Sequence, residues 1–250
     1  MKRALALLLV LAVVACATSP LGRRQLILVD GNQMTQMGIA SFDEMKKKTP
    51  ETKDAKAIAY VGCVARNVTS VMPGGNWEVR VFEDKQVNAF ALPGGKIGVY
   101  TGLLKVATTQ DQLAAVIGHE VAHVIAGHSA ERVSEGLAAE MGGSVVQAAT
   151  GVDPQVLGIA TNVFFVLPHS RTQEAEADIL GQDYMAKAGF DPRASIALWE
   201  NMSRSGGEKP PEVLSTHPAD STRIKGLTKR LTISTPLYEQ AQAAGKKPRC

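Results

Sequence analysis

Apolar residues recur at helical spacing in several stretches of the chain. In residues 52–70 and 111–125 they fall on one face, at the i, i+3, i+4 and i+7 positions of an amphipathic helix. The same spacing predicts three more helices in the C-terminal part of the chain. These cover residues 172–188, 192–203 and 221–231.

Between the first two helices the pattern changes to alternation, as in a half-buried strand. Residues 77–82 predict one strand, and residues 87–92 and 96–100 predict two more. The last two are joined by Pro93-Gly94-Gly95, which is a turn sequence. Three short strands followed by helices favour an α+β fold that is mainly helical and contains one small three-stranded sheet.

The segment 136–168 is rich in Ala, Gly and Val, and its only charged residues are Glu140 and Asp153. Its longest uncharged stretch continues to residue 170 but begins with a proline and contains another, so it does not have the sequence of a transmembrane helix. We interpret 136–168 as helices and loops that cover the middle of the domain. A surface that touches a membrane is the alternative.

The first fifteen residues have the composition of a secretory signal. Lys2 and Arg3 precede an apolar run at 4–15, which is too short to cross a hydrocarbon core that needs about 20 residues. The run ends in Val-Val-Ala-Cys at 13–16, which resembles the lipobox of bacterial lipoproteins. In that family the cysteine, here Cys16, is acylated and becomes the new N-terminus. The alternative is a plain signal peptide with an incidental cysteine.

The lipobox resemblance also implies a location. Two acyl chains on Cys16 would anchor the protein stably to a membrane, whereas a single chain would not. In such lipoproteins an alanine after the cysteine, here Ala17, implies the outer membrane. We therefore expect a protein on the periplasmic side of the outer membrane, lipid-anchored through Cys16.

Composition and charge add a few exclusions. Of the 250 residues, 45% are hydrophobic and 20% charged, which is typical of a globular protein and not of a disordered one. The formal charge of +3 is too small for nucleic acid to be the main expected partner. Removal of residues 1–15 would take away two positive charges and leave the chain nearly neutral.

The three cysteines are too few for a protein built on a disulfide framework. If Cys16 carries lipid in an oxidising compartment, Cys63 and Cys250 remain as an even pair. We predict a disulfide between them that ties the C-terminal tail to the helix carrying Cys63. A buried free thiol at Cys63 and a loose one at Cys250 are the alternative.

The clearest chemical motif lies inside the helix predicted at 111–125. His119-Glu120-Val121-Ala122-His123 has the form His-Glu-x-x-His. Four residues of α-helix turn through about 400°, so the two imidazoles lie on one face, one turn apart. That spacing lets two nitrogens reach one Zn²⁺, while Glu120 is placed to act on the zinc's water as a general base. The motif predicts one catalytic zinc per chain.

A catalytic zinc site needs a third protein ligand, and the sequence directly after the motif does not supply the metzincin one. Metzincins have glycine and histidine where this chain has Ala126 and Ser129. His128 is nine residues past His119, about 900° of rotation, which points it to the opposite side of a continuous helix. We therefore interpret His128 as a structural residue or one that supports a ligand.

The best candidate for the third ligand is Glu174. Glu174 and Asp178 are at i and i+4 on one face of the helix predicted at 172–188. The glutamate can bind a metal while the aspartate orients a ligand imidazole. Alone, such an acidic helix would be a solvated face, but in combination with the His-Glu-x-x-His motif it favours a metal site.

The motifs, and the order in which they follow one another along the chain, resemble those of the HtpX-like and CAAX-prenyl-protease family of zinc metallopeptidases, which are gluzincins. The resemblance covers roughly residues 50–231 and rests on 88–95 with Gly102-Leu103-Leu104, on HEVAH, on EAEAD at 174–178, and on Thr216-His217-Pro218 with Arg223. The chain is most similar to the periplasmic BepA- and LoiP-type branch. It lacks the several membrane helices of the other branches, which argues against prenylated substrates.

The resemblance implies a zincin-type metalloprotease domain with His119, His123 and Glu174 as zinc ligands and Glu120 as general base. It also implies an edge strand to which a substrate peptide adds antiparallel through main-chain hydrogen bonds, whereas the residues alone predict only a hairpin strand. This expected substrate strand consists of Asn88, Ala89, Phe90, Ala91 and Leu92.

His217 has three interpretations. In relatives of the BepA type, a histidine at this position can occupy the open site of the zinc and keep the enzyme latent. Alternatively, His217 could donate a hydrogen bond to the transition state. The third interpretation is a loop residue before a proline.

These inferences predict four segments: a lipoprotein signal peptide at 1–15, a lipidated N-terminus and tether at 16–34, a zinc metallopeptidase domain at 35–235 and a C-terminal tail at 236–250. Family and location together predict cleavage of unfolded or misassembled envelope proteins in periplasmic quality control, with the envelope assembly machinery as a candidate partner. One alternative is a non-catalytic, zinc-containing chaperone or assembly lipoprotein of the outer membrane. Another is a lipoprotein scaffold that recruits partners through the segment 136–168.

Overall fold

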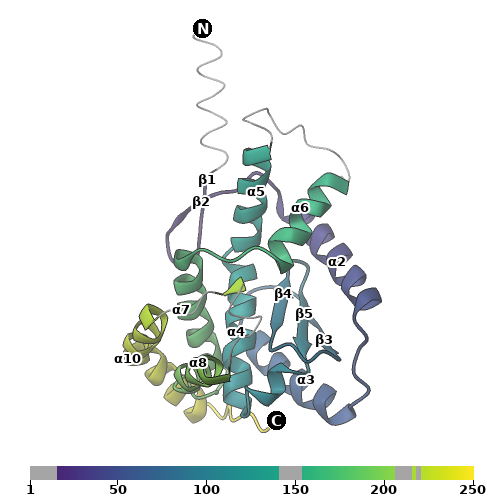
Figure 1. The fold of residues 1–250 in the computed structure, drawn as a ribbon. Helices are drawn as coiled ribbons and strands as arrows, with labels where there is room; N and C mark the ends of the chain where they lie inside the picture. The colour runs from purple at the N-terminus through teal and green to yellow at the C-terminus, as the bar shows by residue number, and fades with distance from the viewer. Residues whose placement is uncertain (1–15, 141–153, 206–215, 218–220) are drawn as a thin grey trace.

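The computed structural model describes residues 16–140, 154–205, 216–217 and 221–250 (Figure 1). The expected signal peptide at 1–15 lies outside the described residues, and so does part of the apolar segment 136–168. In the described part of the chain, helices pack around one small three-stranded sheet. This arrangement confirms the predicted α+β, mainly helical fold class.

The sheet consists of the three predicted strands, each with ends moved by at most two residues. They are β3 (Glu78–Phe82), β4 (Ala89–Leu92) and β5 (Lys96–Tyr100). β5 lies in the centre, with β3 parallel to it on one side and β4 antiparallel on the other. The turn from β4 to β5 uses Gly94 and Gly95, which both have positive φ, a conformation that favours glycine. β4 is therefore an edge strand of this sheet.

Helix α4 (Gln110–Ile125) runs through the middle of the fold (Figure 1). It begins after Thr109, whose side chain accepts a hydrogen bond from the backbone N–H of Gln112. The elements that pack most extensively against it are α3 (Ala55–Thr69), α7 (Arg171–Lys187), α8 (Ala194–Ser205) and strand β4. Because α4 is surrounded on several sides, its side chains can be buried and still meet groups from distant parts of the chain.

The remaining elements lie around this centre. They are β1 (Cys16–Thr18), β2 (Arg24–Leu26), α2 (Gly31–Lys48), the 3-10 helix η1 (Leu103–Lys105), α5 (His128–Glu140), α6 (Pro154–Phe165) and α10 (Ser221–Ala243). The end of α5 and the whole of α6 belong to the apolar segment 136–168, and the two helices pack against each other. Among the helices that the structure describes, none combines the length and the hydropathy needed to cross a bilayer.

Helix α2 is not among the predicted helices, although its apolar residues Met34, Met37, Phe42 and Met45 recur at helical spacing. Its start is fixed by a capping box in which the Asp30 carboxylate accepts hydrogen bonds from the backbone of Asn32 and Gln33, while the Gln33 side chain bonds back. Met37 and Phe42 are almost completely buried. A strong cap and a few buried side chains are therefore enough to place this helix on the fold.

The segment 16–34, expected as a tether, packs against the domain in the structure. β1 pairs antiparallel with β2, and the side chain of Gln25 is buried. Arg23, in the turn between the two strands, forms ion pairs with Glu131 of α5 at 2.5 Å and Glu176 of α7 at 3.0 Å. The segment is ordered by polar contacts to distant residues, which leave no apolar periodicity in the sequence.

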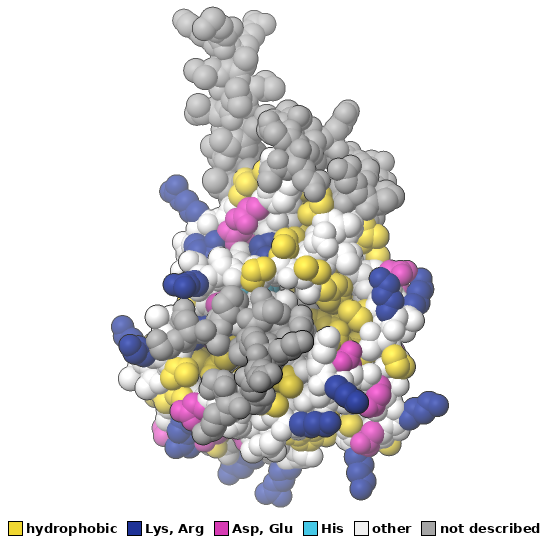
Figure 2. All heavy atoms as spheres, in the orientation of Figure 1, with side chains coloured by type: hydrophobic (Ala, Val, Ile, Leu, Met, Phe, Trp, Pro, Cys, Tyr) yellow, Lys and Arg dark blue, Asp and Glu magenta, His cyan; other side chains and the backbone are white. Residues whose placement is uncertain are grey.

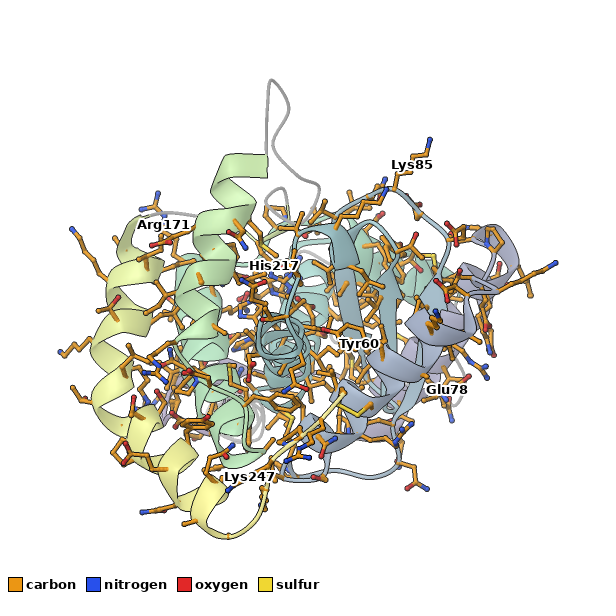
Figure 3. The ribbon with its side chains drawn as sticks, turned by 90° about the horizontal axis from the view of Figure 1, so that it is seen from below. Tyr60, Glu78, Lys85, Arg171, His217 and Lys247 are labelled. Atoms are coloured by element: carbon orange, nitrogen blue, oxygen red, sulfur yellow. A yellow bond between two sulfur atoms is a disulfide. The ribbon has the colours of Figure 1, made fainter. Side chains whose placement is uncertain are left out.

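The C-terminal part is also more structured than the sequence pattern indicates. The helix expected at 221–231 continues to Ala243 as α10. Beyond it the chain returns to α3, where Cys250 forms a disulfide with Cys63, visible as a yellow bond in Figure 3. Gln110 of α4 donates to the carbonyl of Pro248 at 3.0 Å and accepts from the backbone of Cys250 at 2.8 Å. The end of the chain is thus fixed to both α3 and α4.

Candidate metal centre

The two histidines of the His-Glu-x-x-His motif are buried where α4 approaches α7 most closely. His119 is 8% exposed and His123 is 3% exposed. Gly118 of α4 faces Gly181 of α7, and a Cβ built on Gly181 would lie only 2.7 Å from the backbone nitrogen of His119. Any larger residue at these positions would push the helices apart, so the two glycines allow Glu174 on α7 to reach the histidines.

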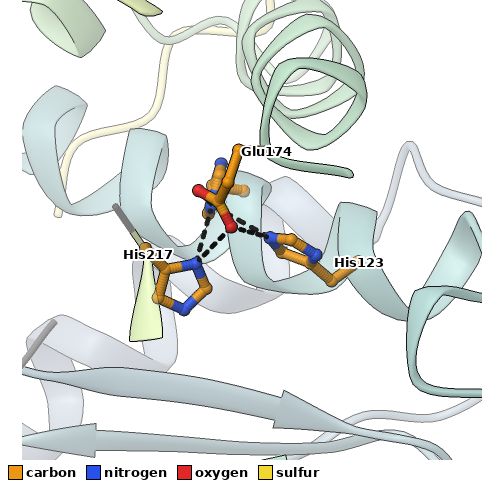
Figure 4. Close-up of side chains that lie close together, drawn as sticks. His123, Glu174 and His217 are labelled. Carbon is orange, nitrogen blue, oxygen red and sulfur yellow. Dashed lines mark hydrogen bonds and ion pairs between the residues drawn. The ribbon is translucent and has the colours of Figure 1, made fainter. Parts of the chain in front are cut away.

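Four buried side chains each bring one donor atom to a common point, and these atoms all lie within 4.8 Å of one another. They belong to His119, His123, Glu174 and His217 (Figure 4). His119 Nε2 lies 3.1 Å from His123 Nε2 and 3.3 Å from His217 Nδ1. Glu174 Oε1 lies 3.0 Å from His217 Nδ1 and 3.4 Å from His123 Nε2.

The spacing and chemistry of these donors fit a zinc ion. Two nitrogens bound at about 2.0–2.1 Å to a tetrahedral zinc lie roughly 3.3 Å apart. The nitrogens of His119, His123 and His217 are separated by similar distances, 3.1 and 3.3 Å. Imidazole nitrogens and a carboxylate oxygen are also the ligands that zinc commonly takes in proteins. The site can therefore hold the metal that the motif predicts.

Glu120 lies beside the four donors without being one of them. It is buried, and its Oε1 is 3.5 Å from His217 Nε2. Among the described residues this oxygen has no hydrogen-bond partner. Burial raises the pKa of Glu120, although the nearby His217 and His119 oppose the shift. A carboxylate with a raised pKa next to a metal site is suited to accept a proton and to return it.

Asp178 lies behind His119, on the side away from the other three donors. His119 Nδ1 lies 3.1 Å from Asp178 Oδ1, and Asp178 accepts hydrogen bonds of 2.6 and 2.8 Å from Arg223. The guanidinium of Arg223 lies 3.8 Å from the centroid of the Trp199 ring. Burial lowers the pKa of His119, but hydrogen bonds to Asp178 and Glu174 outweigh this effect and raise the pKa to about 9.

His128 lies against His123, not on the opposite side of the helix. The predicted rotation requires a continuous helix, and α4 is not continuous up to His128. α4 ends at Ile125, Gly127 has a φ of 70°, and α5 begins at His128. The chain therefore turns, and His128 Nδ1 comes to 2.8 Å from His123 Nδ1. The left-handed glycine is the sequence signal that could have indicated this break.

Two further residues near the centre have no predicted role. Glu176 Oε2 lies 3.1 Å from His128 Nε2; its only signal is that it is the middle acid of the EAEAD segment. The ring of His169 lies 3.9 Å from the ring of His123, measured between centroids. No pattern in the sequence distinguishes His169, which simply precedes the N-cap of α7.

The expected substrate strand borders the same cleft. Residues Asn88 to Ala91 line a pocket together with Glu120 and His217, and residues 163–165 of α6 form an apolar wall. Figure 2 shows apolar side chains on the face that carries β4 and α6. In the described part of the chain, β5 is the only strand that pairs with β4. The structure therefore brings the strand, the acid and the four donors together.

Comparison with known proteins identifies relatives of this chain. The sequence profile of peptidase family M48 matches residues 52–231. The mitochondrial metalloendopeptidase OMA1 of Saccharomyces cerevisiae is 36% identical over 183 residues, which cover 70% of this chain and 53% of that protein. The OMA1 metalloendopeptidase of Homo sapiens is 32% identical over 241 residues, 87% of this chain and 46% of that protein. The chain spans about half the length of these two relatives.

A bacterial relative matches over nearly its whole length. The metalloprotease YcaL of Escherichia coli is 24% identical over 249 residues, which cover 89% of this chain and 96% of that protein. The predicted family of metallopeptidases is confirmed at the level of M48. The OMA1 relatives do not specifically support the HtpX-like or CAAX-prenyl-protease assignment.

The comparisons contradict the expected location. We expected a protein on the periplasmic side of the outer membrane, anchored through Cys16. The OMA1 relatives from yeast, plant and human are all named as mitochondrial metalloendopeptidases. The lipobox resemblance rests on four residues, whereas these similarities extend over most of the chain, so the location inferred from Cys16 is wrong.

Proposed function

This chain belongs to peptidase family M48 and carries a metalloendopeptidase domain, and we propose that it uses zinc to cleave unfolded or misassembled proteins in protein quality control. The convergence of His119, His123 and Glu174 beside the buried Glu120 carries this proposal. The first three residues would hold one zinc ion, and Asp178 would orient His119. Bound zinc supplies Lewis-acid activation of water and of the scissile carbonyl.

Glu120 provides the proton transfers. Its Oε1 lies at the edge of the donor cluster, close enough to take a proton from a water that attacks the carbonyl carbon. As the C–N bond breaks, the same oxygen returns the proton to the leaving amine nitrogen. Burial raises the pKa of Glu120, which favours this exchange because the carboxylate holds the accepted proton more firmly than an exposed glutamate would.

β4 supports the choice of substrate. A peptide that adds antiparallel to residues 88–92 would be bound through its main chain, which every sequence offers. In a folded protein nearly all buried main-chain groups are already paired, so only an unfolded or extended segment can bind in this way. The position of β4 on the cleft therefore favours unfolded or misassembled proteins over a particular side-chain sequence.

We propose that His217 keeps the enzyme latent. A catalytic zinc site has three protein ligands and one open position, and His217 Nδ1 adds a fourth donor to the cluster. Replacement of His217 by alanine should raise basal proteolysis, measured with casein. Lower activity would instead indicate a hydrogen bond to the transition state, and unchanged activity would indicate a loop residue.

The four donors also favour a second function. A structural zinc site fills all four positions with protein ligands, so His119, His123, Glu174 and His217 could form one in a non-catalytic chaperone or assembly factor. Digestion of casein with and without a chelator separates the two functions. Cleavage that the chelator abolishes supports the peptidase, whereas zinc binding without cleavage by both the unaltered chain and His217→Ala supports the chaperone.

Glu120→Gln tests the mechanism. Loss of the base should lower the rate of casein cleavage by roughly 10²- to 10⁴-fold, while zinc content and thermal unfolding stay close to those of the unaltered chain. Glu239→Gln, at an exposed glutamate of α10, is the matched control and should keep full activity. Full activity of Glu120→Gln would refute the assigned role.

A further inference from the structure

A chain of hydrogen bonds leads from His123 away from the donor cluster. His123 Nδ1 lies 2.8 Å from His128 Nδ1, and His128 Nε2 lies 3.1 Å from Glu176 Oε2. His128 is completely buried, and Glu176 is 5% exposed. Because both groups are buried, each depends on its hydrogen-bonded neighbours in this series for the bonds that water would otherwise provide.

Only one arrangement of protons satisfies the whole chain when a metal is bound. His123 Nε2 faces the donor cluster, so a metal would take the lone pair there and the proton would be at Nδ1. That proton is donated to His128 Nδ1. His128 must then hold its own proton at Nε2 and donate it to Glu176, which as a carboxylate can only accept. The result is a neutral His128 between a ligand and an anion.

The last group of this series of hydrogen bonds, Glu176, is held by the N-terminal segment, residues 16–34. Glu176 accepts hydrogen bonds from Arg23 Nε, at 3.0 Å, and from the hydroxyl of Ser19. The other two nitrogens of Arg23 donate to Glu131 of α5 at 2.5 and 2.7 Å. Gln25 donates to the carbonyl of Ala126, directly after α4, at 2.8 Å. The segment thus contacts α4, α5 and α7 around this support.

We propose that His128 positions His123 for metal binding, and that Arg23 and Ser19 support it through Glu176, so that the N-terminal segment is part of the zinc site. This inference rests on the proposed function, because it requires that the cluster binds zinc. His128 and Glu176 do not touch the metal. They fix the ring orientation and the protonated nitrogen of a ligand that does.

The first test compares two replacements of His128 in the full chain. His128→Leu keeps much of the volume but removes both hydrogen bonds, and zinc affinity, measured by competition with a chromogenic chelator, should fall by roughly 10- to 100-fold. His128→Gln offers both an acceptor and a donor, and should retain more of the affinity. The absorption spectrum of bound Co²⁺ should change in His128→Leu more than in His128→Gln.

The second test asks whether the N-terminal segment acts on the metal. Arg23→Met should weaken zinc binding by roughly threefold to tenfold, less than His128→Leu because it acts through two further groups. Arg230→Met is a matched control: Arg230 also binds a carboxylate of α7, that of Asp183, and its side chain is 25% exposed against 26% for Arg23. Arg230→Met should lower thermal stability but leave zinc affinity unchanged.

The outcomes distinguish a failure of this inference from a failure of the proposed function on which it rests. If His128→Leu and Arg23→Met melt earlier but bind zinc as tightly as the unaltered chain, these residues only stabilise the fold and the inference is overturned. If Arg230→Met weakens zinc binding as much as Arg23→Met does, the effect is general destabilisation, and the inference is again overturned. If the unaltered chain binds no zinc, the proposed function fails and this inference fails with it.

Discussion

The two histidines of the motif lie one turn apart on α4, yet the groups behind them differ. His119 meets the carboxylate of Asp178 directly. His123 reaches the carboxylate of Glu176 only through a second imidazole, that of His128. Both carboxylates come from α7, and each is bound by an arginine from another part of the chain. One helix therefore supports both histidines, but over different distances.

The two histidines also differ in which part of the polypeptide chain supplies the residues that support them. The support of His119 ends at Arg223, which lies within residues 52–231, the part that matches family M48. The support of His123 ends at Ser19 and Arg23, which precede that part. A segment outside the family match thus reaches the metal site on one side only.

The largest combined effect on stability and metal binding is expected from Gly181→Ala, which should disturb the supports of both histidines at once. The new Cβ would lie 2.7 Å from the backbone nitrogen of His119 and cannot be relieved by a side-chain rotation. We expect a loss of about 3 kcal/mol in the free energy of unfolding, at the upper end for overpacking, together with weaker zinc binding. Urea unfolding and chelator competition measure the two quantities.

Gly226→Ala is the control for this comparison. Gly226 is in α10, and a Cβ built there has nothing within 4 Å. Alanine in a helix is favoured over glycine by about 1 kcal/mol, so this variant should be slightly more stable, with unchanged zinc affinity. If Gly181→Ala behaved in the same way, the close contact of α4 and α7 would not be needed for either support.

Removal of the disulfide should separate stability from metal binding. Cys63 and Cys250 fix the end of the chain to α3 and contact neither support. Replacement of both by serine should lower the free energy of unfolding by roughly 2–4 kcal/mol, as is usual for the loss of a disulfide. Zinc affinity should stay within twofold of that of the unaltered chain. A large loss of affinity would show that the site responds to any destabilisation.

The sequence predicts the His119 side far better than the His123 side. Two fixed spacings are sufficient for the first: His119 to His123 on one helix, and Glu174 to Asp178 on another. Each spacing is local, so the geometry of an α-helix places the side chains. The three strands and the helices around α4 are predicted for the same reason, since their apolar positions repeat with a local period.

The His123 side could not be predicted because its contacts are neither local nor apolar. Arg23 and Glu176 are far apart in the sequence, and an ion pair leaves no periodic pattern. The rotation count predicts the wrong side for His128 because it assumes an unbroken helix, whereas α4 ends before Gly127. Helix α2 could have been predicted from local signals, because Asp30 and Gln33 form a capping box and Met34, Met37 and Phe42 follow at helical spacing.

Asp178→Asn against Glu176→Gln tests whether a direct support matters more than an indirect one. Both changes remove one negative charge from α7. Asp178 contacts His119, a proposed zinc ligand, so its replacement should weaken zinc binding by roughly 10- to 100-fold. Glu176 acts through His128, and we expect about tenfold or less. Equal losses, measured by chelator competition, would show that the interposed imidazole transmits the full effect and that the two supports are equivalent.

Ser19→Ala should have the smallest effect and is the sharpest test of the N-terminal end. It removes one donor to Glu176 but leaves the hydrogen bond from Arg23 at 3.0 Å. A single hydrogen bond contributes about 0.5–1.5 kcal/mol to stability, and only part of this should reach the metal, so we expect about twofold weaker zinc binding. Ser234→Ala is the control. Ser234 is a buried serine of α10 that also donates to a side chain of α7, that of Gln182, but lies outside the N-terminal segment. An equal change of zinc affinity in the two variants would remove the distinction between the N-terminal segment and the rest of the polar interior.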